Sequence, residues 1–329
     1  MRKPLLAMAS MLLFGVAAVQ PYTAAAQQPQ TLVVGIAPSI DMSLLIVAVN
    51  KGFLEKEGVK SQLQLFDSAP AALQGVVAGR ADITENTEPP QLGARARGGK
   101  IVQIMTGYLS GKQNGIVVNA KAISKPQDFA GKSVGVQKGS GANYHLAWYL
   151  ERHKMAVDKV NVRYMDAPDQ IAALARGDIQ GFFSWEPYLT KAATSVPDAK
   201  LYERSMDDGL VFGGSVVMRE DLAKGNKAFA VKVVKGLIAA ADWITANPRE
   251  AAKVVNEVVH APSDDVVYEQ LRALDWPGTF KKEAVAQELR IAEWGAGTGL
   301  FPTKNPKQLV DELVYPAIIK EAAPSRTDL

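Results

Sequence analysis

Short runs of β-branched residues alternate with amphipathic stretches along most of the chain from Thr31 onward. Residues 32–36 form a nearly continuous apolar run, typical of a buried strand, and the helical spacing of residues 43–56 closes at Gly58. This alternation predicts an α/β fold whose parallel-rich sheets carry helices on both faces and bind ligands at the carboxyl ends of their strands. Further strand-like runs are residues 62–66, 82–84, 101–105, 116–118, 133–137, 160–164 and 179–183.

After residues 213–218 the pattern becomes helical. Pro248 follows Asn247, as in the first turn of a helix, and Ser263 stands where an N-cap is expected. Amphipathic C-terminal helices that pack on a core are predicted at residues 229–246, 264–274, 283–294 and 306–319. We expect these helices to support the fold and not to form part of the functional site.

Two segments, 67–83 and 166–179, resemble each other. Each passes from a strand through a turn and a short helix to Gly and Asp before the next strand. Two similar α/β lobes would explain the likeness, and so would the turn chemistry that all βα units share.

The composition excludes several classes of protein. With 47% hydrophobic residues in 329, the chain can bury a large core, and its length favours two domains or lobes. The absence of cysteine excludes disulfides, thiolate metal sites and a cysteine nucleophile. With 37 Lys and Arg against 34 Asp and Glu, dispersed along the chain, we expect no nucleic-acid partner.

Residues 1–26 have the pattern of a secretory signal peptide. Arg2 and Lys3 precede an apolar run over residues 5–19, and small residues at 24–26 suit cleavage. The alternative is a membrane anchor, but about 15 apolar residues fall short of the roughly 20 that span a bilayer. Because no cysteine follows the run, we expect a freely soluble periplasmic protein without a lipid anchor.

Three loops carry candidate chemistry. In residues 136–144, Ser140 stands between a strand and a helix, where free N–H groups could bind an anion, although a well-capped turn is the favoured explanation. In residues 84–90, Glu85 lies near a strand end and is the better ligand candidate, since Glu88 suits the helix dipole. In residues 182–188, Trp185 could cover a ligand or pack in a core, and Glu186 could latch the lobes.

The sequence offers no positive sign of catalysis. None of His145, His153 and His260 has metal-ligand spacing, so ordinary surface or packing histidines are the favoured interpretation. Neither a nucleophile elbow nor a phosphate-binding loop is present. We expect no enzymatic activity, no metal and no cofactor.

Four segments in register resemble periplasmic substrate-binding proteins of ABC importers for sulfonates, taurine and nitrate, which are related to thiamine-precursor binders. They are residues 48–58, residues 128–140, residues 173–179 and the run Trp185-Glu186-Pro187-Tyr188. The resemblance implies a bilobal type II binding fold with a cleft and hinge. It places lobe 1 at residues 27–118 and 216–329 and lobe 2 at 119–215, with crossings near 118–120 and 213–216.

The resemblance also implies a function and a pocket. A monomer would close on a small solute and deliver it to a membrane permease with its ATPase. The implied ligand-binding residues are Ser39, Asp41, Met42, Glu85, Asn86, Thr87, Ser140, Gly141, Asn143, Trp185, Glu186 and Ser215.

One departure leaves the ligand open. Residues 84–87 read Thr-Glu-Asn-Thr where sulfonate binders commonly have Ser-Thr-Gly-Asp, and a carboxylate would repel a sulfonate unless a cationic group lay between them. An amine-bearing sulfonate, a nitrogenous heterocycle and an aromatic acid all remain open. The alternative functions are an enzyme of the same fold, of the pyrimidine-synthase or menaquinone-pathway type, and a protein that presents ligand to a sensor.

Overall fold

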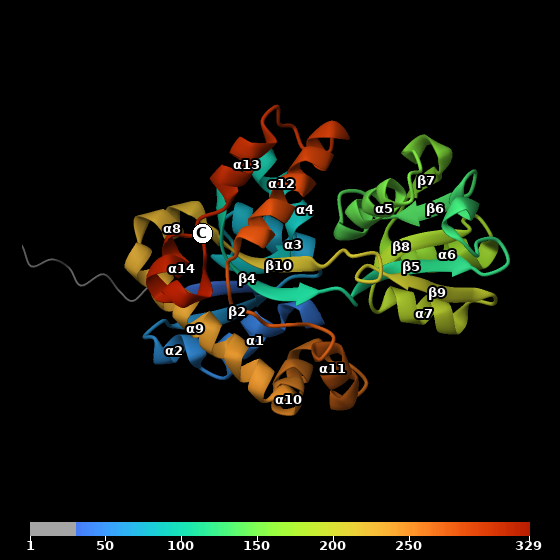
Figure 1. Ribbon diagram of the computed structural model, residues 1–329. Helices are drawn as coiled ribbons and strands as arrows, with labels where there is room; N and C mark the ends of the chain where they lie inside the picture. Colours follow the sequence, from blue (N-terminus) through green and yellow to red (C-terminus); the bar gives the residue numbers. More distant parts are fainter. Residues whose placement is uncertain (1–30) are drawn as a thin grey trace, which may run out of the picture.

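The computed structural model describes residues 31–329, and the predicted signal peptide lies outside them. Two lobes lie side by side, each built on one five-stranded sheet (Figure 1). The strands of lobe 1 are, in order, β2 (Ser61–Leu65), β1 (Leu32–Ile36), β3 (Ile83–Thr87), β10 (Phe212–Arg219) and β4 (Ile101–Ser110). Those of lobe 2 are β7 (Asn161–Tyr164), β6 (Ser133–Val136), β8 (Gly181–Trp185), β5 (Asn114–Asn119) and β9 (Ala199–Arg204).

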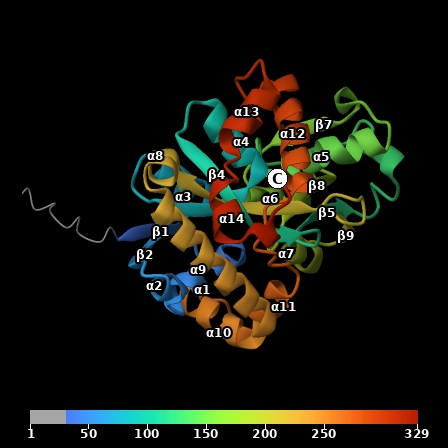
Figure 2. The ribbon, with the colours of Figure 1, turned by 60° about the vertical axis from the view of Figure 1, so that its left-hand side comes forward.

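Helices cover both faces of each sheet, as the alternation predicted. In lobe 1, α9 crosses one face beside α1, while α12 and α13 lie with α4 on the other (Figure 2). Lobe 1 contains α1 (Ser43–Asn50), α2 (Phe53–Lys56), α3 (Ala69–Val77), α4 (Glu88–Ala96), α8 (Glu220–Gly225), α9 (Lys227–Ala246), α10 (Pro248–Val259), α11 (Asp264–Leu271), α12 (Lys282–Gly297), α13 (Pro306–Leu313) and α14 (Ala317–Ala322). Lobe 2 contains α5 (Gly141–Arg152), α6 (Ala167–Arg176) and α7 (Tyr188–Ser195). Four 3₁₀ turns are η1 (Ile40–Met42), η2 (Pro126–Phe129), η3 (Val157–Lys159) and η4 (Pro324–Arg326).

The α/β prediction is confirmed, although the sheets are mixed. β1 pairs in parallel with β2 and β3, and β6 pairs in parallel with β7 and β8. The antiparallel pairings all involve β10 or β5, which adjoin the crossings between the lobes. β5 and β10 each enter their sheet from the other lobe and run opposite to the neighbouring strands of the βα units. The antiparallel pairs are therefore a consequence of the two crossings.

Both crossings come earlier in the chain than predicted. The chain leaves lobe 1 at residues 111–113, between β4 and β5, and returns at residues 205–211, between β9 and β10. Ile116 and Val118 of β5 pack in the lobe 2 core with Phe129, whereas Val216 and Met218 of β10 pack in the lobe 1 core. The predicted crossing near 213–216 therefore falls inside β10 and the one near 118–120 at the end of β5, because a local pattern does not show which sheet a strand joins.

Local capping follows the sequence at the two helix starts where a serine N-cap was considered. Ser140 and Ser263 accept hydrogen bonds from backbone N–H groups three residues later, as N-caps do. Pro248 begins α10 as predicted, but the amide of Asn247 donates instead to the carbonyl of Trp243. No helix within residues 31–329 is long and apolar enough to cross a membrane.

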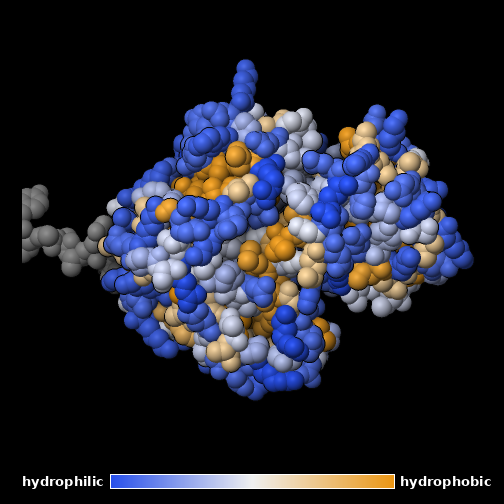
Figure 3. All heavy atoms as spheres, viewed as in Figure 1, coloured by the Kyte–Doolittle hydropathy of each residue, from blue (hydrophilic) through white to orange (hydrophobic). Residues whose placement is uncertain are grey.

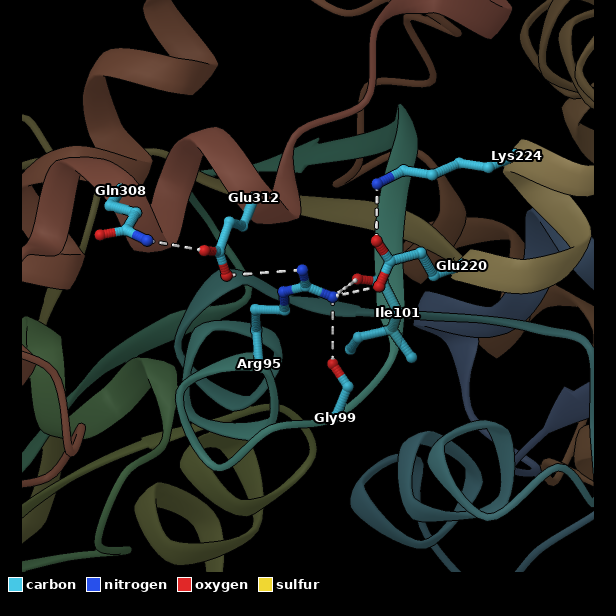
Figure 4. A network of polar contacts seen from close by, with 7 residues as sticks. All are labelled: Arg95, Gly99, Ile101, Glu220, Lys224, Gln308 and Glu312. Carbon is cyan, nitrogen blue, oxygen red and sulfur yellow. Dashed lines mark hydrogen bonds and ion pairs between the residues drawn. The ribbon is translucent and has the colours of Figure 1, made fainter.

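A buried arginine ties several elements of lobe 1 together (Figure 4). Arg95 of α4 pairs with Glu220 of α8 at 2.6 Å and with Glu312 of α13 at 3.5 Å. Its guanidinium also donates to the carbonyls of Gly99 and Ile101 at 3.3 and 3.4 Å. These contacts fix the end of lobe 1 away from lobe 2, so the edge that carries the candidate site rests on a rigid frame.

Candidate functional site

In each lobe, carboxyl ends of strands lie next to the two crossings that join the lobes. In lobe 1, β3 and β4 end where β10 begins, with Thr87 opposite Gly214 and Ser110 opposite Phe212. In lobe 2, β8 ends at Trp185, opposite the first residue of β5. Because β4 continues into β5 and β9 into β10, these edges face each other (Figure 1). This is where an open α/β sheet binds ligands.

On the lobe 1 edge, Glu85 is a buried carboxyl without a partner. Its side chain is fully buried, and neither carboxylate oxygen has a hydrogen-bond partner among the described residues. It packs on the backbone of Gly107, where a Cβ atom would collide with the carboxylate and lie 2.8 Å from Leu44. Burial, followed by the charge of Asp41, raises the pKa of Glu85 well above its usual range.

Three predicted residues lie in the turn that follows β1. Asp41 is partly exposed in η1, and burial raises the pKa of this carboxyl. The hydroxyl of Ser39 is occluded and lies beside the Asp41 carboxyl, where it partly offsets the rise in pKa, and Met42 is fully buried in the core. Since η1 contacts β3, this turn and Glu85 form one side of the candidate site.

Tyr108 of β4 is a member of this edge that the sequence did not reveal. It is 3% exposed, packs on Gly214 and meets Trp276 edge-on at 6.1 Å between ring centroids. Burial, with the charges of Asp41, Glu85 and Glu88, raises the pKa of its phenol. The signal available was the Gly-Tyr pair at a strand end, which is too common to single out.

Glu88 ties α4 to the returning crossing. One oxygen accepts hydrogen bonds from the N–H of Gly213 at 2.8 Å and from Gln287 at 3.2 Å, and Gln287 also donates to the carbonyl of Val211 at 2.9 Å. The other oxygen has no partner among the described residues, and burial raises the pKa of Glu88 to about 7. Besides complementing the helix dipole, Glu88 therefore holds the start of β10 in place.

Asn86 and Ser215 belong to a buried network inside lobe 1. Gln91 donates to the backbone carbonyls of both residues, at 2.6 and 2.8 Å. Gln103 in turn donates to Gln91 at 2.7 Å and to Glu288 at 2.6 Å, and burial raises the pKa of Glu288 well above its usual range. The Asn86 side chain donates to the carbonyl of Ala69 at 3.1 Å, so its amide already has a structural role.

On the lobe 2 edge, the start of α5 forms a capped turn. Ser140 accepts from the N–H of Asn143 at 3.2 Å and donates to the carbonyl of Gln137 at 2.7 Å. Asn143 accepts from the N–H of Gly139 at 3.0 Å. Gly141 lies against Phe212 of lobe 1, with 3.4 Å between the nearest ring carbon and a Cβ built there. The turn is thus both well capped and turned toward the other lobe.

Trp185 and Glu186 end β8, and their roles differ. Trp185 is partly exposed and meets Tyr188 edge-on at 6.0 Å. Glu186 accepts from Arg204 at 2.6 Å and from the Thr190 hydroxyl at 2.9 Å, both in lobe 2, so the expected latch between lobes is absent. Arg204 also donates to the carbonyl of Lys112 at 2.7 Å. Glu186 therefore braces the first crossing rather than bridging the cleft.

The two crossings are hydrogen-bonded to each other. Met206 N–H and the Ser205 hydroxyl both donate to the carbonyl of Gly111, at 3.0 and 3.1 Å. Met206 and Val211 are about two-fifths exposed, and apolar surface shows where the lobes adjoin (Figure 3). A pair of short, mutually bonded segments is the arrangement expected of a hinge.

Aromatic side chains also join the lobes beside the hinge. Tyr144 of α5 meets Trp294 of α12 at 5.3 Å and Phe212 at 6.4 Å between ring centroids, both edge-on. Trp148 of α5 donates to the carbonyl of Asp208 at 3.1 Å. Within residues 31–329, no group of three or more His, Cys, Asp or Glu side chains is placed to hold a metal ion.

Comparison with known proteins identifies the class. The family model described as NMT1/THI5 like matches residues 39–251, and the chain belongs to this family. A Bacillus subtilis protein described as an aliphatic sulfonates-binding protein is 24% identical over 290 residues, which is 81% of this chain and 86% of that protein. The taurine-binding periplasmic protein of Escherichia coli is 25% identical over 206 residues, 62% of this chain and 63% of that protein.

Solved structures share the fold. The alkanesulfonate-binding protein SsuA from Xanthomonas axonopodis, bound to MOPS, aligns with a TM-score of 0.70 at 22% identity, over 88% of this chain and 100% of that one. The nitrate-binding protein NrtA from Synechocystis aligns with a TM-score of 0.70 at 15% identity, over 91% and 89%. The desulfurization enzyme DSZB aligns with a TM-score of 0.66 at 17% identity, over 89% and 99%. The resemblance stated from the sequence and the bilobal fold that it implied are confirmed.

Proposed function

We propose that this protein is the periplasmic solute-binding component of an ABC importer. A monomer captures a small organic solute between its lobes and delivers it to a membrane permease with its ATPase. The observation that carries the proposal is the pair of facing strand-end edges, joined by two short crossings that bond to each other at Gly111. The likeness to sulfonate- and taurine-binding proteins over most of the chain supports it.

The mechanism needs no covalent step. A solute that contacts both edges binds the closed arrangement better than an open one, and so shifts the population of lobe positions. The change is confined to residues 111–113 and 205–211, because each lobe has its own core. The closed form then presents a surface that the open form lacks, which a permease can recognise.

An enzymatic role has less support, although DSZB shares the fold. The chain has no cysteine, and among residues 31–329 His145 has no hydrogen-bond partner at either ring nitrogen. A general base needs to lie within hydrogen-bond reach of a proton that it removes. The expected chemistry is therefore reversible binding.

The first test is a thermal-shift screen of the purified protein, scored together with product analysis. We expect at least one small organic solute to raise the melting temperature and to be recovered unchanged. Intrinsic tryptophan fluorescence should change with the same ligand, since Trp185 and Trp294 lie near the lobe contacts. Turnover of a bound compound would contradict the proposal, as would a screen in which no sulfonate, amine, heterocycle or carboxylate binds.

Trp185→Ala tests the placement of the cleft. Removing a partly exposed ring at the end of β8 should weaken binding of the ligand found in that screen by about fivefold, since stacking on an aromatic ring contributes on the order of 1 kcal/mol. Tyr315→Ala is the matched control, because Tyr315 is a partly exposed ring of lobe 1 that lies beside Lys224 of α8, away from lobe 2. Titration calorimetry measures both variants, and equal affinity in the two would show that the cleft lies elsewhere.

A further inference from the structure

The lobe 1 edge concentrates carboxyl groups without a basic partner. The charges that act on Tyr108 come from Asp41, Glu85 and Glu88, and all of them are acidic. Glu88 is held by a backbone N–H and by the amide of Gln287, both uncharged. Burial raises the pKa of all three carboxyls, so a cation placed against them would favour their ionised forms, which no basic side chain here does.

Glu85 also has unused hydrogen-bonding capacity. Both of its oxygens are occluded and unpartnered within residues 31–329. A buried polar group that lacks a hydrogen bond costs on the order of 1–3 kcal/mol, and more when it is ionised. Gly107 has no side chain, and the Glu85 carboxyl occupies the space that a side chain there would fill. The packing therefore holds the buried, unpartnered carboxyl in place.

The opposite edge adds no free positive charge at the end of β8. Arg204 is the guanidinium at that point, and it is already paired with Glu186 at 2.6 Å and bonded to the carbonyl of Lys112. What remains there is the partly exposed ring of Trp185, and the face of an indole attracts cations. At the ends of β3 and β8, the site therefore favours a positively charged group over an anion.

We propose that the site binds a small organic cation with N–H donors, an amine or amidinium whose charged nitrogen lies against Glu85 and Asp41. This inference rests on the proposed function and names its substrate class. The cation supplies the donors that Glu85 lacks and neutralises the acidic edge, while Trp185 contacts the remainder of the ligand. An alkanesulfonate, by contrast, brings a second negative charge to the same edge.

Matched probes test the charge of the ligand. Benzamidine, benzamide and benzenesulfonate share one ring and differ in charge, and propylamine and propanesulfonate form the corresponding aliphatic pair. We expect benzamidine or propylamine to raise the melting temperature, and the neutral and anionic partners to leave it unchanged. If a sulfonate binds and neither cation does, the inference is wrong while the proposed function stands. If no solute of any charge binds, both are wrong.

Variants test the position of the charged nitrogen. Glu85→Gln keeps the shape of the side chain, and we expect it to weaken binding of the cationic probe at least tenfold in titration calorimetry. Glu283→Gln, an exposed acid at the start of α12, changes the net charge equally and should bind as the native protein does. If Glu85→Gln fails to fold, Asp41→Asn, which alters a partly exposed side chain, must show the loss. Unchanged affinity in a folded Glu85→Gln variant overturns the assignment.

Discussion

At the scale of single residues, His145 is an ionisable group kept neutral by its surroundings. Its imidazole is fully buried in α5, lies edge-on to Phe183 at 5.1 Å and to Phe212 at 6.5 Å, and has no hydrogen-bond partner among the described residues. Burial lowers the pKa of His145 to about 3. The sequence favoured a packing or surface histidine, and packing is what the structure shows.

This histidine gives a pH-dependent prediction. Its pKa is lowered on folding from about 6.5, so its contribution to stability is complete above pH 6.5 and is lost as the pH falls from 6.5 toward 3. His145→Leu removes the proton that the unfolded chain would gain. We expect the unfolding free energy of the variant relative to the native protein to rise by about 1.4 kcal/mol for each pH unit below 6.

Urea unfolding at pH 7, 6 and 5 measures this difference. His260→Asn is the control, because His260 is an exposed residue in left-handed conformation at the end of α10, where asparagine is readily accommodated. A difference between His145→Leu and the native protein that stays constant with pH would contradict the account of a buried neutral imidazole.

At the scale of elements, the path of β4 depends on Gly107, which lies beside the carboxyl of Glu85. The pairing of β4 with β10 shifts register between Gly214 and Ser215, and Gly107 lies opposite that irregularity. A side chain at Gly107 would occupy the place of the Glu85 carboxyl. The end of β4, which leads into the first crossing, is therefore built around Glu85.

Gly107→Ala should consequently destabilise lobe 1. The added methyl group overpacks the space between β4, Glu85 and Leu44, which costs roughly 1–3 kcal/mol. Gly225→Ala is the matched control at the end of α8, where nothing lies within 4 Å of a Cβ atom. Urea unfolding should show a lower midpoint for Gly107→Ala alone. A midpoint equal to that of the native protein would mean that the Glu85 carboxyl moves without cost.

Local pattern predicted eight of the strands, because each is a short apolar or alternating run bounded by turns. The edge strand β9 was missed, since Ala199–Arg204 is half polar and partly exposed. β10 was not among the predicted strands, and its place between β3 and β4 depends on pairing across more than 100 residues, which no local pattern encodes. For the same reason Glu85 was identified as a candidate from its strand end, while Tyr108 and Trp294 were not.

At the scale of the whole molecule, two kinds of contact hold the lobes in the described position. The crossings bond to each other through Gly111, and the aromatic contact of Tyr144 with Trp294 spans from α5 to α12. The hydrogen bonds between the crossings fix the axis about which the lobes can turn. The aromatic contact is made only when the lobes are close. The described position of the lobes therefore depends on the aromatic pair.

Trp294→Leu should then open the molecule. An edge-on aromatic pair contributes about 0.5–1.5 kcal/mol beyond its buried area, which corresponds to a shift of roughly two- to tenfold in the ratio of closed to open forms. We expect small-angle scattering of the ligand-free variant to give a larger radius of gyration, and ligand affinity to fall by a similar factor. Trp243→Leu, a tryptophan of α9 that packs on Phe53 within lobe 1, should change neither. Equal radii for Trp294→Leu and the native protein would mean that the crossings alone set the lobe positions.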